Sequence, residues 1–125
     1  MNLTIIGTGY VGLVTGACFA EFGYSVTCVD KDNKRLEMLK SGKCPFFEPG
    51  MDELLDKHIN KTKLISFAST IKNNLENTDI IFITVGTPTR RFEDEADLSF
   101  VWQVAEEIAD NINKYCLVVT KSTVP

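Results

Sequence analysis

Gly7-Thr8-Gly9-Tyr10-Val11-Gly12 is the stretch of the sequence that decides the fold. It has the pattern G-x-G-x-x-G, follows the apolar, β-branched run 3–6, and leads into a segment with helical spacing of apolar residues up to Phe22. A glycine-rich turn between a buried strand and a helix is the context that a dinucleotide-binding motif requires. We therefore expect a strand over 3–6, a tight turn, and a helix over 11–22 whose N-terminus faces a phosphate group.

Each glycine of this motif has an expected role. Gly7 permits the tight turn, Gly9 lets the backbone approach a pyrophosphate, and Gly12 lets the helix pack closely on the strand. The alternative is a glycine-rich turn without a ligand. Asp30 favours the ligand, because it lies 18 residues after Gly12 at the end of the next strand-like run. A carboxylate there can accept hydrogen bonds from both hydroxyls of an adenosine ribose and repels the 2′-phosphate of NADP, which predicts NAD as the cofactor.

Two cations beside Asp30 provide a counterargument. Lys31 and Arg35 could accommodate a 2′-phosphate, although Arg35, one turn into the following helix, could equally cover the adenine. An NADP-linked oxidoreductase of another family is therefore the rival to the NAD prediction, and it would bind NADP more tightly than NAD.

The rest of the chain alternates between strand-like and helix-like patterns. Further strands are expected at 25–30, 63–67, 79–85 and 115–120. Further helices are expected at 31–40, 51–59, 70–75 and 98–112. The last helix has an expected apolar stripe of Val101, Ala105, Ile108, Ala109 and Ile112. This alternation predicts an α/β, Rossmann-like fold with a doubly wound parallel sheet in the order 3-2-1-4-5, truncated after its fifth strand.

Polar residues follow the fourth and fifth expected strands, at the edge where open α/β sheets bind their ligands. At the end of the fourth strand, Val85 and Gly86 lead to Thr87 and Thr89, whose hydroxyls could bind a ribose or the pyrophosphate. The alternative is that this segment is a plain turn without a ligand. After the fifth strand, Lys121-Ser122-Thr123 would face the nicotinamide half of the cleft. The acidic segment 90–97 is expected to be a solvated loop in which Asp97 caps the next helix.

Composition limits the size, partners and location of the protein. The 125 residues suffice for one domain, and a net charge of −4 argues against nucleic-acid binding, which needs a basic surface. No apolar run approaches the roughly 20 residues that span a bilayer, and no basic region precedes an apolar core at the N-terminus, so we expect a cytoplasmic protein without membrane contact. The 4 cysteines show no C-x-x-C spacing and His58 is the sole histidine, so no metal site is expected.

Several segments together resemble the UDP-glucose/GDP-mannose dehydrogenase family over the whole chain and in order. They are Gly7-Thr8-Gly9-Tyr10-Val11-Gly12-Leu13, Glu48-Pro49-Gly50, Val85-Gly86-Thr87-Pro88-Thr89, Ala96-Asp97-Leu98 and Ser122-Thr123-Val124-Pro125. Within the family, the sequence is most similar to the branch that acts on UDP-glucose. The resemblance implies a two-step, four-electron oxidation of the C6 alcohol of the sugar to a carboxylate, which consumes two NAD and yields UDP-glucuronate.

The resemblance also implies roles for individual residues. It implies contacts to NAD from Val11, Asp30, Arg35, Thr87 and Thr123, with the glycine-rich loop at the pyrophosphate. Motif and resemblance together give the expected cofactor residues Gly7, Gly9, Tyr10, Val11, Gly12, Asp30, Arg35, Val85, Thr87, Thr89, Ser122 and Thr123. Arg35 stands where bacterial relatives often have lysine, which preserves the charge. Thr123 is also expected to orient the water that hydrolyses a thioester intermediate.

The nucleophilic cysteine, the catalytic lysine and most contacts to the sugar nucleotide are implied to lie beyond residue 125, in a central helical region and a second α/β domain. Residues 1–125 are therefore expected to be an NAD-binding fragment that is inactive alone and belongs to a homo-oligomeric enzyme of a UDP-sugar. The alternatives are a dehydrogenase of GDP-mannose or UDP-N-acetylmannosamine, and a module that senses NAD without catalysis.

Overall fold

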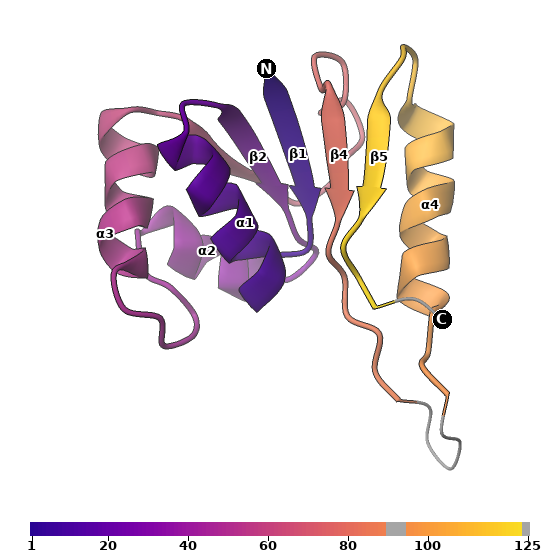
Figure 1. The fold of residues 1–125 in the computed structure, drawn as a ribbon, viewed down its shortest axis with the longest axis horizontal. Helices are drawn as coiled ribbons and strands as arrows, with labels where there is room; N and C mark the ends of the chain where they lie inside the picture. Colours follow the sequence, from indigo (N-terminus) through magenta and orange to yellow (C-terminus); the bar gives the residue numbers. More distant parts are fainter. Residues whose placement is uncertain (90–94, 124–125) are drawn as a thin grey trace.

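Five parallel strands form the centre of the molecule, in the order β3-β2-β1-β4-β5 (Figure 1). The computed structural model describes residues 1–89 and 95–123. The strands are β1 (Asn2–Ile6), β2 (Ser25–Val29), β3 (Ile65–Ala68), β4 (Ile80–Ile83) and β5 (Leu117–Thr120). All neighbouring strands pair in parallel, so the predicted fold class and strand order are confirmed.

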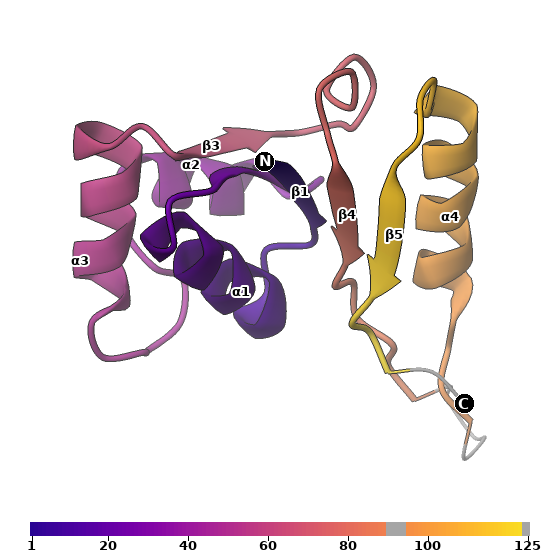
Figure 2. The same cartoon turned by 45° about the horizontal axis from the view of Figure 1, so that its top comes forward.

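The strand register places three chain segments next to one another at the carboxyl edge of the sheet. Ile6 at the end of β1 pairs with Val29 of β2 and with Ile83 of β4. The segments that follow these three strands therefore leave the sheet side by side. Figure 2 shows that the chain after β4 and after β5 continues beyond this edge in extended segments.

The residues that the structure describes form four α-helices beside the sheet: α1 (Tyr10–Glu21), α2 (Asn33–Lys40), α3 (Met51–Asp56) and α4 (Ser99–Asn111). A π-helical turn, η1 (Lys57–Lys61), extends α3, so the helical stretch predicted over 51–59 continues two residues further and its last part is π-helical. The Asp32 carboxylate caps α2 by accepting from the Arg35 N–H. The Asp97 carboxylate accepts from the Ser99 N–H at 2.9 Å in the turn before α4, but the N-cap residue is Leu98, so Asp97 lies one residue ahead of the capping position expected for it. Of the acidic loop expected over 90–97, residues 90–94 lie outside the described residues.

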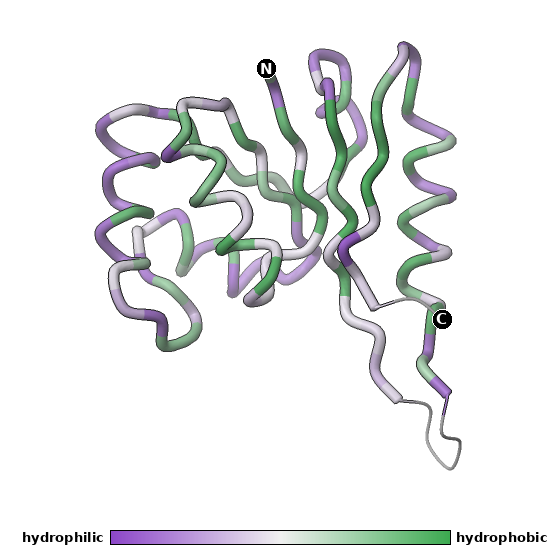
Figure 3. The backbone as a smooth tube through the Cα atoms, in the orientation of Figure 1, coloured by the Kyte–Doolittle hydropathy of each residue, from purple (hydrophilic) through white to green (hydrophobic). Residues whose placement is uncertain are grey.

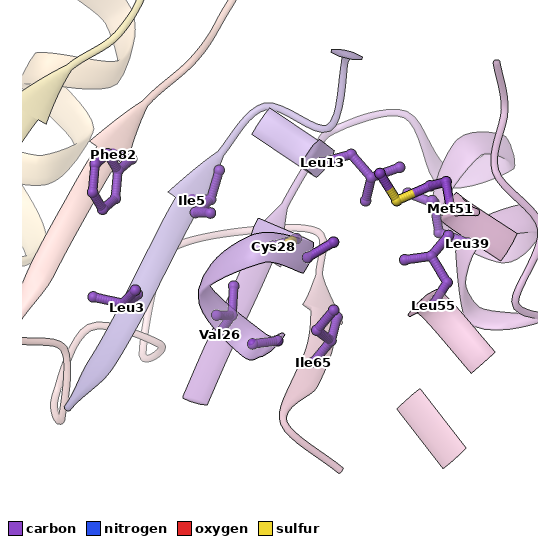
Figure 4. Close-up of a cluster of buried hydrophobic side chains, with 12 residues drawn as sticks. Leu3, Ile5, Leu13, Val26, Cys28, Leu39, Met51, Leu55, Ile65 and Phe82 are labelled. Atoms are coloured by element: carbon purple, nitrogen blue, oxygen red, sulfur yellow. The ribbon is translucent and has the colours of Figure 1, made fainter. Parts of the chain in front are cut away.

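Side-chain alternation along the strands gives the sheet two apolar faces. Leu3 and Ile5 of β1 point to the first face, where they join buried residues of α1 and α3 (Figure 4). Gly16 lets α1 approach this face, since a Cβ there would already lie 3.1 Å from the Ile5 side chain. The strands are correspondingly the most continuously hydrophobic parts of the chain in Figure 3.

The second face packs against α4 through a stripe that only partly matches the predicted one, since Ile108 and Ile112 lie on it but the two predicted alanines do not. Val104 and Ile108 are the buried residues of α4, and they join Ile6 of β1 and other strand residues in one cluster. Ala105 and Ala109, predicted on the buried stripe, are exposed. Burial of a valine removes more apolar surface from water than burial of an alanine. The helix orientation in which Val104 faces the core is therefore favoured over one that buries Ala105.

The helix predicted over 70–75 is wrong, because side chains there compete for the backbone groups. The Thr70 hydroxyl accepts from the Lys72 N–H at 3.1 Å, and the Asn74 amide donates to the carbonyls of both residues. Asn73 has a φ of +63°, which ends any helical run. Ile71 and Leu75 are both buried in the cluster under α4. None of the helices within the described ranges is long and apolar enough to cross a membrane.

Candidate cofactor site

The glycine-rich turn between β1 and α1 is held against the end of β4. Gly7 has a φ of +104°, and a Cβ there would lie 2.8 Å from the Thr84 carbonyl oxygen. A Cβ on Gly12 would lie 2.0 Å from the Gly7 carbonyl oxygen. The Thr84 hydroxyl donates to the carbonyls of Ile6 and Gly7, at 2.8 and 3.0 Å. Glycine is therefore required at 7 by backbone conformation and at 12 by packing.

Gly9 differs from the other two glycines of the motif. Its φ of −72° suits any residue, and no atom lies within 4 Å of a Cβ built on it. It is the N-cap of α1, yet no side chain in the described part of the structure caps this end, and no acidic residue lies in the first turn. The free N–H groups and the positive end of the helix dipole are therefore open to an anion. The missing side chain at position 9 fits the close approach of a pyrophosphate.

Asp30 is tied to this turn by two hydrogen bonds from Thr8. One Asp30 oxygen, Oδ2, accepts from the Thr8 N–H at 2.9 Å and from the Thr8 hydroxyl at 2.6 Å. The other, Oδ1, accepts from the Asp32 N–H at 2.9 Å. A carboxylate has about four acceptor positions. The contacts within the described residues thus leave Oδ1 room for about one further hydrogen bond, whereas the sequence predicted bonds to both hydroxyls of a ribose.

The environment of Asp30 keeps its carboxyl ionised. Burial opposes the charge and acts to raise the pKa of Asp30, but the hydrogen bonds from Thr8 and Asp32 act against it. The Arg35 guanidinium, 3.8 Å from Oδ2, adds to their effect, and the pKa of Asp30 is lowered from its ordinary value. At neutral pH the group is therefore a hydrogen-bond acceptor that repels phosphate.

A cleft of about 660 Å³ extends from the glycine-rich turn to α4. Most of the predicted cofactor residues line it, namely Gly7, Gly9, Tyr10, Val11, Asp30, Arg35, Val85, Thr87, Ser122 and Thr123. Gly12 and Thr89 do not line it. Gly12 is packed beneath the turn, and Thr89 is exposed and forms an antiparallel bridge with Ala96. The structure therefore brings Thr87, but not Thr89, to the cleft.

Two predicted residues at the cleft have partners within the protein. The Ser122 hydroxyl donates to the Val85 carbonyl at 2.7 Å and so joins the segments that follow β4 and β5. The ring of Tyr10 lies at the rim against Phe46, with ring centroids 5.3 Å apart. A hydrogen bond with the Glu48 carboxylate is the main cause that raises the pKa of Tyr10, which keeps its hydroxyl protonated.

Sequence reasoning missed several residues of the cleft. Thr8 was not singled out, although it lies between two motif glycines and anchors Asp30. Apolar side chains from three distant parts of the chain also line the cleft, at Val29, Ile71 and Val104. Apolar walls of this kind suit a flat purine ring. On α4, Phe100, Gln103 and Glu107 also line the cleft, at the spacing of one helix face.

Comparison with known proteins agrees with this geometry. A family model described as "UDP-glucose/GDP-mannose dehydrogenase family, NAD binding domain" matches residues 1–125. The chain belongs to the UDP-glucose/GDP-mannose dehydrogenase family. It is the NAD-binding domain of this family, so the NAD prediction is confirmed at the level of the family.

Individual relatives bear the same family names. The chain is 50% identical to a UDP-glucose 6-dehydrogenase of Rhizobium meliloti over 100% of its own length and 28% of the relative's. The identity to a UDP-glucose 6-dehydrogenase of Pseudomonas aeruginosa is 43%, over 100% of this chain and 27% of the relative. The chain thus spans little more than a quarter of the length of these relatives.

Solved structures show the same fold. A UDP-glucose dehydrogenase from Pyrobaculum islandicum superposes with a TM-score of 0.92 at 35% identity, covering 99% of this chain and 29% of that one. A GDP-mannose dehydrogenase from Pseudomonas aeruginosa, solved as a ternary complex, also has a TM-score of 0.92, at 33% identity and with the same coverage. Structural similarity is therefore equal for relatives that act on two different sugar nucleotides.

Proposed function

We propose that the chain is the NAD-binding part of a UDP-glucose 6-dehydrogenase, which oxidises the C6 alcohol of UDP-glucose to a carboxylate and yields UDP-glucuronate. The observation that carries the proposal is the similarity of the whole chain to curated UDP-glucose 6-dehydrogenases, at 50% and 43% identity. The conversion removes four electrons and takes up one water, so it consumes two NAD. Bound NAD supplies the acceptor for the hydride at each of the two oxidations.

In this proposal the residues of the cleft bind and orient the cofactor. The open N-terminus of α1 at Gly9 holds the pyrophosphate, and Asp30 Oδ1 accepts a hydrogen bond from the adenosine ribose. Arg35 lies over the adenosine end, and Thr87 lies at the end of β4. Thr123, which lines the cleft after β5, is proposed to position the water that the second oxidation requires.

An assay of the full-length protein tests the substrate and the stoichiometry together. With UDP-glucose limiting and NAD in excess, we expect two NADH for each UDP-glucose. GDP-mannose and UDP-N-acetylmannosamine serve as matched substrates, because relatives with these specificities have the same fold. If the protein oxidised one of these instead of UDP-glucose, it would belong to another branch of the family and the proposed substrate would be wrong. No NADH from any of the three would favour a module that senses NAD without catalysis.

A second assay addresses residues 1–125 alone. We propose that the catalytic cysteine and the sugar-nucleotide contacts lie outside these residues, so the fragment binds NAD but gives no NADH with UDP-glucose. An amide-resolved NMR titration should show shifts around Gly9, Asp30 and Thr123 with NAD, and weaker binding of NADP. Asp30→Ala should weaken NAD binding by about 1.5–3 kcal/mol, as expected for lost hydrogen bonds to a charged group. The cytoplasmic location and the homo-oligomeric state stay predictions.

A further inference from the structure

Lys31 and Glu107 form an ion pair across the adenosine end of the cleft. Lys31 follows Asp30 at the end of β2, whereas Glu107 lies on α4, 76 residues later in the chain. The Lys31 ammonium lies 2.8 Å from a Glu107 carboxylate oxygen. Both residues line the cleft. The pair therefore joins the two walls between which the adenosine half of a dinucleotide would lie.

The pair matters because of what a cation beside Asp30 can bind. A ribose held by Asp30 carries either a 2′-hydroxyl, in NAD, or a 2′-phosphate, in NADP. Of the basic residues that follow Asp30 along the chain, Lys31 and Arg35 line the cleft and could neutralise such a phosphate, whereas Lys34 does not line it. Arg35 lies 3.8 Å from the Asp30 carboxylate, and Lys31 is held by Glu107. Each cation thus already faces a carboxylate.

We propose that Glu107 is a second determinant of cofactor selectivity, acting together with Asp30. It holds the Lys31 ammonium away from the ribose and places a further negative charge at the cleft wall. A 2′-phosphate would then meet two carboxylates, which already face the cleft-lining cations beside Asp30, Lys31 and Arg35. The Lys31 side chain is 72% exposed and that of Glu107 is 38% exposed. An ion pair in this setting is weak, so Lys31 can turn to another anion once Glu107 loses its charge.

The test measures the dissociation constants of NAD and NADP for residues 1–125 by NMR titration, in wild type and in four variants. Glu107→Gln removes the charge and keeps the size. Lys31→Met removes the cation, and the double variant removes both charges. Glu106→Gln is the matched control, since Glu106 is exposed on the same helix and does not line the cleft. The amide spectrum of each variant shows whether it is folded.

We expect Glu107→Gln to tighten NADP binding by about three- to tenfold and to change NAD binding by less than about twofold, as an exposed charge pair allows. In the Lys31→Met background, the same substitution should change NADP binding by less than about threefold, because no cation is released. Glu106→Gln should leave the ratio of the two constants unchanged. An unchanged ratio in Glu107→Gln, or an equal effect on both cofactors, would overturn the proposal.

The inference rests on NAD binding in this cleft, and the two can fail separately. Shifts of the wild-type spectrum with NAD at Gly9 and Asp30 establish the cofactor site. If these shifts appear and Glu107→Gln does not alter selectivity, the role of Glu107 is refuted and the site stands. If NAD shifts residues elsewhere on the surface, the cofactor site itself is wrong, and the proposal for Glu107 is overturned with it.

Discussion

Thr8 donates two hydrogen bonds to a single oxygen of Asp30, through its N–H at 2.9 Å and its hydroxyl at 2.6 Å. The two residues are 22 positions apart in the sequence and follow neighbouring strands. Thr8 is buried, and its hydroxyl has the acid as its partner. The glycine-rich turn and the acid after β2 are thus one hydrogen-bonded unit, so the phosphate end and the ribose end of the proposed site are positioned together.

Thr8→Val should destabilise this unit with little change in shape. The variant keeps the N–H bond and loses the hydroxyl bond to a carboxylate, which we expect to lower the free energy of unfolding by about 1.5–3 kcal/mol. The pKa of Asp30 should rise toward its ordinary value, because the hydroxyl is the leading contribution that lowers it. Urea denaturation and a carboxyl NMR titration measure the two effects. Thr120→Val, at an exposed strand position, is the control and should change stability by less than about 0.5 kcal/mol.

The lowered pKa of Asp30 makes part of the stability depend on pH. In the unfolded chain the group titrates near its ordinary value of about 3.9, and in the folded protein it titrates lower. Below that ordinary value the unfolded state binds more protons, so stabilisation by the ionised carboxylate is complete above about pH 4 and is lost as the pH falls through the folded pKa.

Asp30→Asn isolates this contribution. The difference in unfolding free energy between wild type and variant should be constant from about pH 5 to pH 7 and should shrink below about pH 4. Glu21, whose pKa is also lowered, by its hydrogen bonds to Lys57 and His58, is present in both proteins and cancels in the comparison. A gap that stays constant down to pH 3 would show that the charge of Asp30 is not what stabilises the turn.

The parts of the fold that could be predicted are those specified by local pattern. The strand-like runs around Leu3–Ile6 and 79–85 are apolar because both faces of the sheet are covered, and parallel strands with helical connections leave few possible orders. The segment 70–75 shows the limit of this reasoning. The helix expected there does not form, because the Thr70 hydroxyl accepts from the Lys72 N–H and the Asn74 amide donates to the Thr70 carbonyl.

The site residues that could be predicted are those that belong to a sequence motif. The contacts that could not be predicted join two residues that lie far apart in the chain. Gly7, Gly9 and Asp30 follow a known spacing, and all three line the cleft as the motif predicts. The bond from Thr8 to Asp30 and the ion pair from Lys31 to Glu107 join residues far apart in the chain, and no spacing rule connects them. Thr89 was predicted from its place two residues beyond Thr87, but it does not line the cleft and its backbone forms a bridge with Ala96.

Gly12→Ala should damage the fold itself. The new methyl carbon would lie 2.0 Å from the Gly7 carbonyl oxygen and 2.4 Å from the Thr84 hydroxyl, so α1 would have to move away from the turn. We expect a loss of about 3 kcal/mol or more in unfolding free energy, measured by urea denaturation. Gly86→Ala is the matched control, because no atom lies within 4 Å of a Cβ at that position. Equal stability of the two variants would mean that α1 is not packed on the turn as described.

Gly9→Asp should affect stability and cofactor binding in opposite directions. The backbone at Gly9 suits any residue, there is open space for a side chain, and the N-terminus of α1 has no cap. A carboxylate at the N-cap accepts from the free N–H groups and interacts favourably with the helix dipole, so we expect the unfolding free energy to rise by about 0.5–1 kcal/mol. The same carboxylate occupies the place proposed for the pyrophosphate and repels it, so NAD binding should weaken more than about tenfold.

Gly9→Asn separates charge from size, because it caps the helix similarly without the negative charge and should retain more of the binding. Denaturation curves and NAD titrations of the three proteins measure both quantities. A Gly9→Asp variant that is more stable and still binds NAD like wild type would show that the pyrophosphate does not lie at this helix N-terminus.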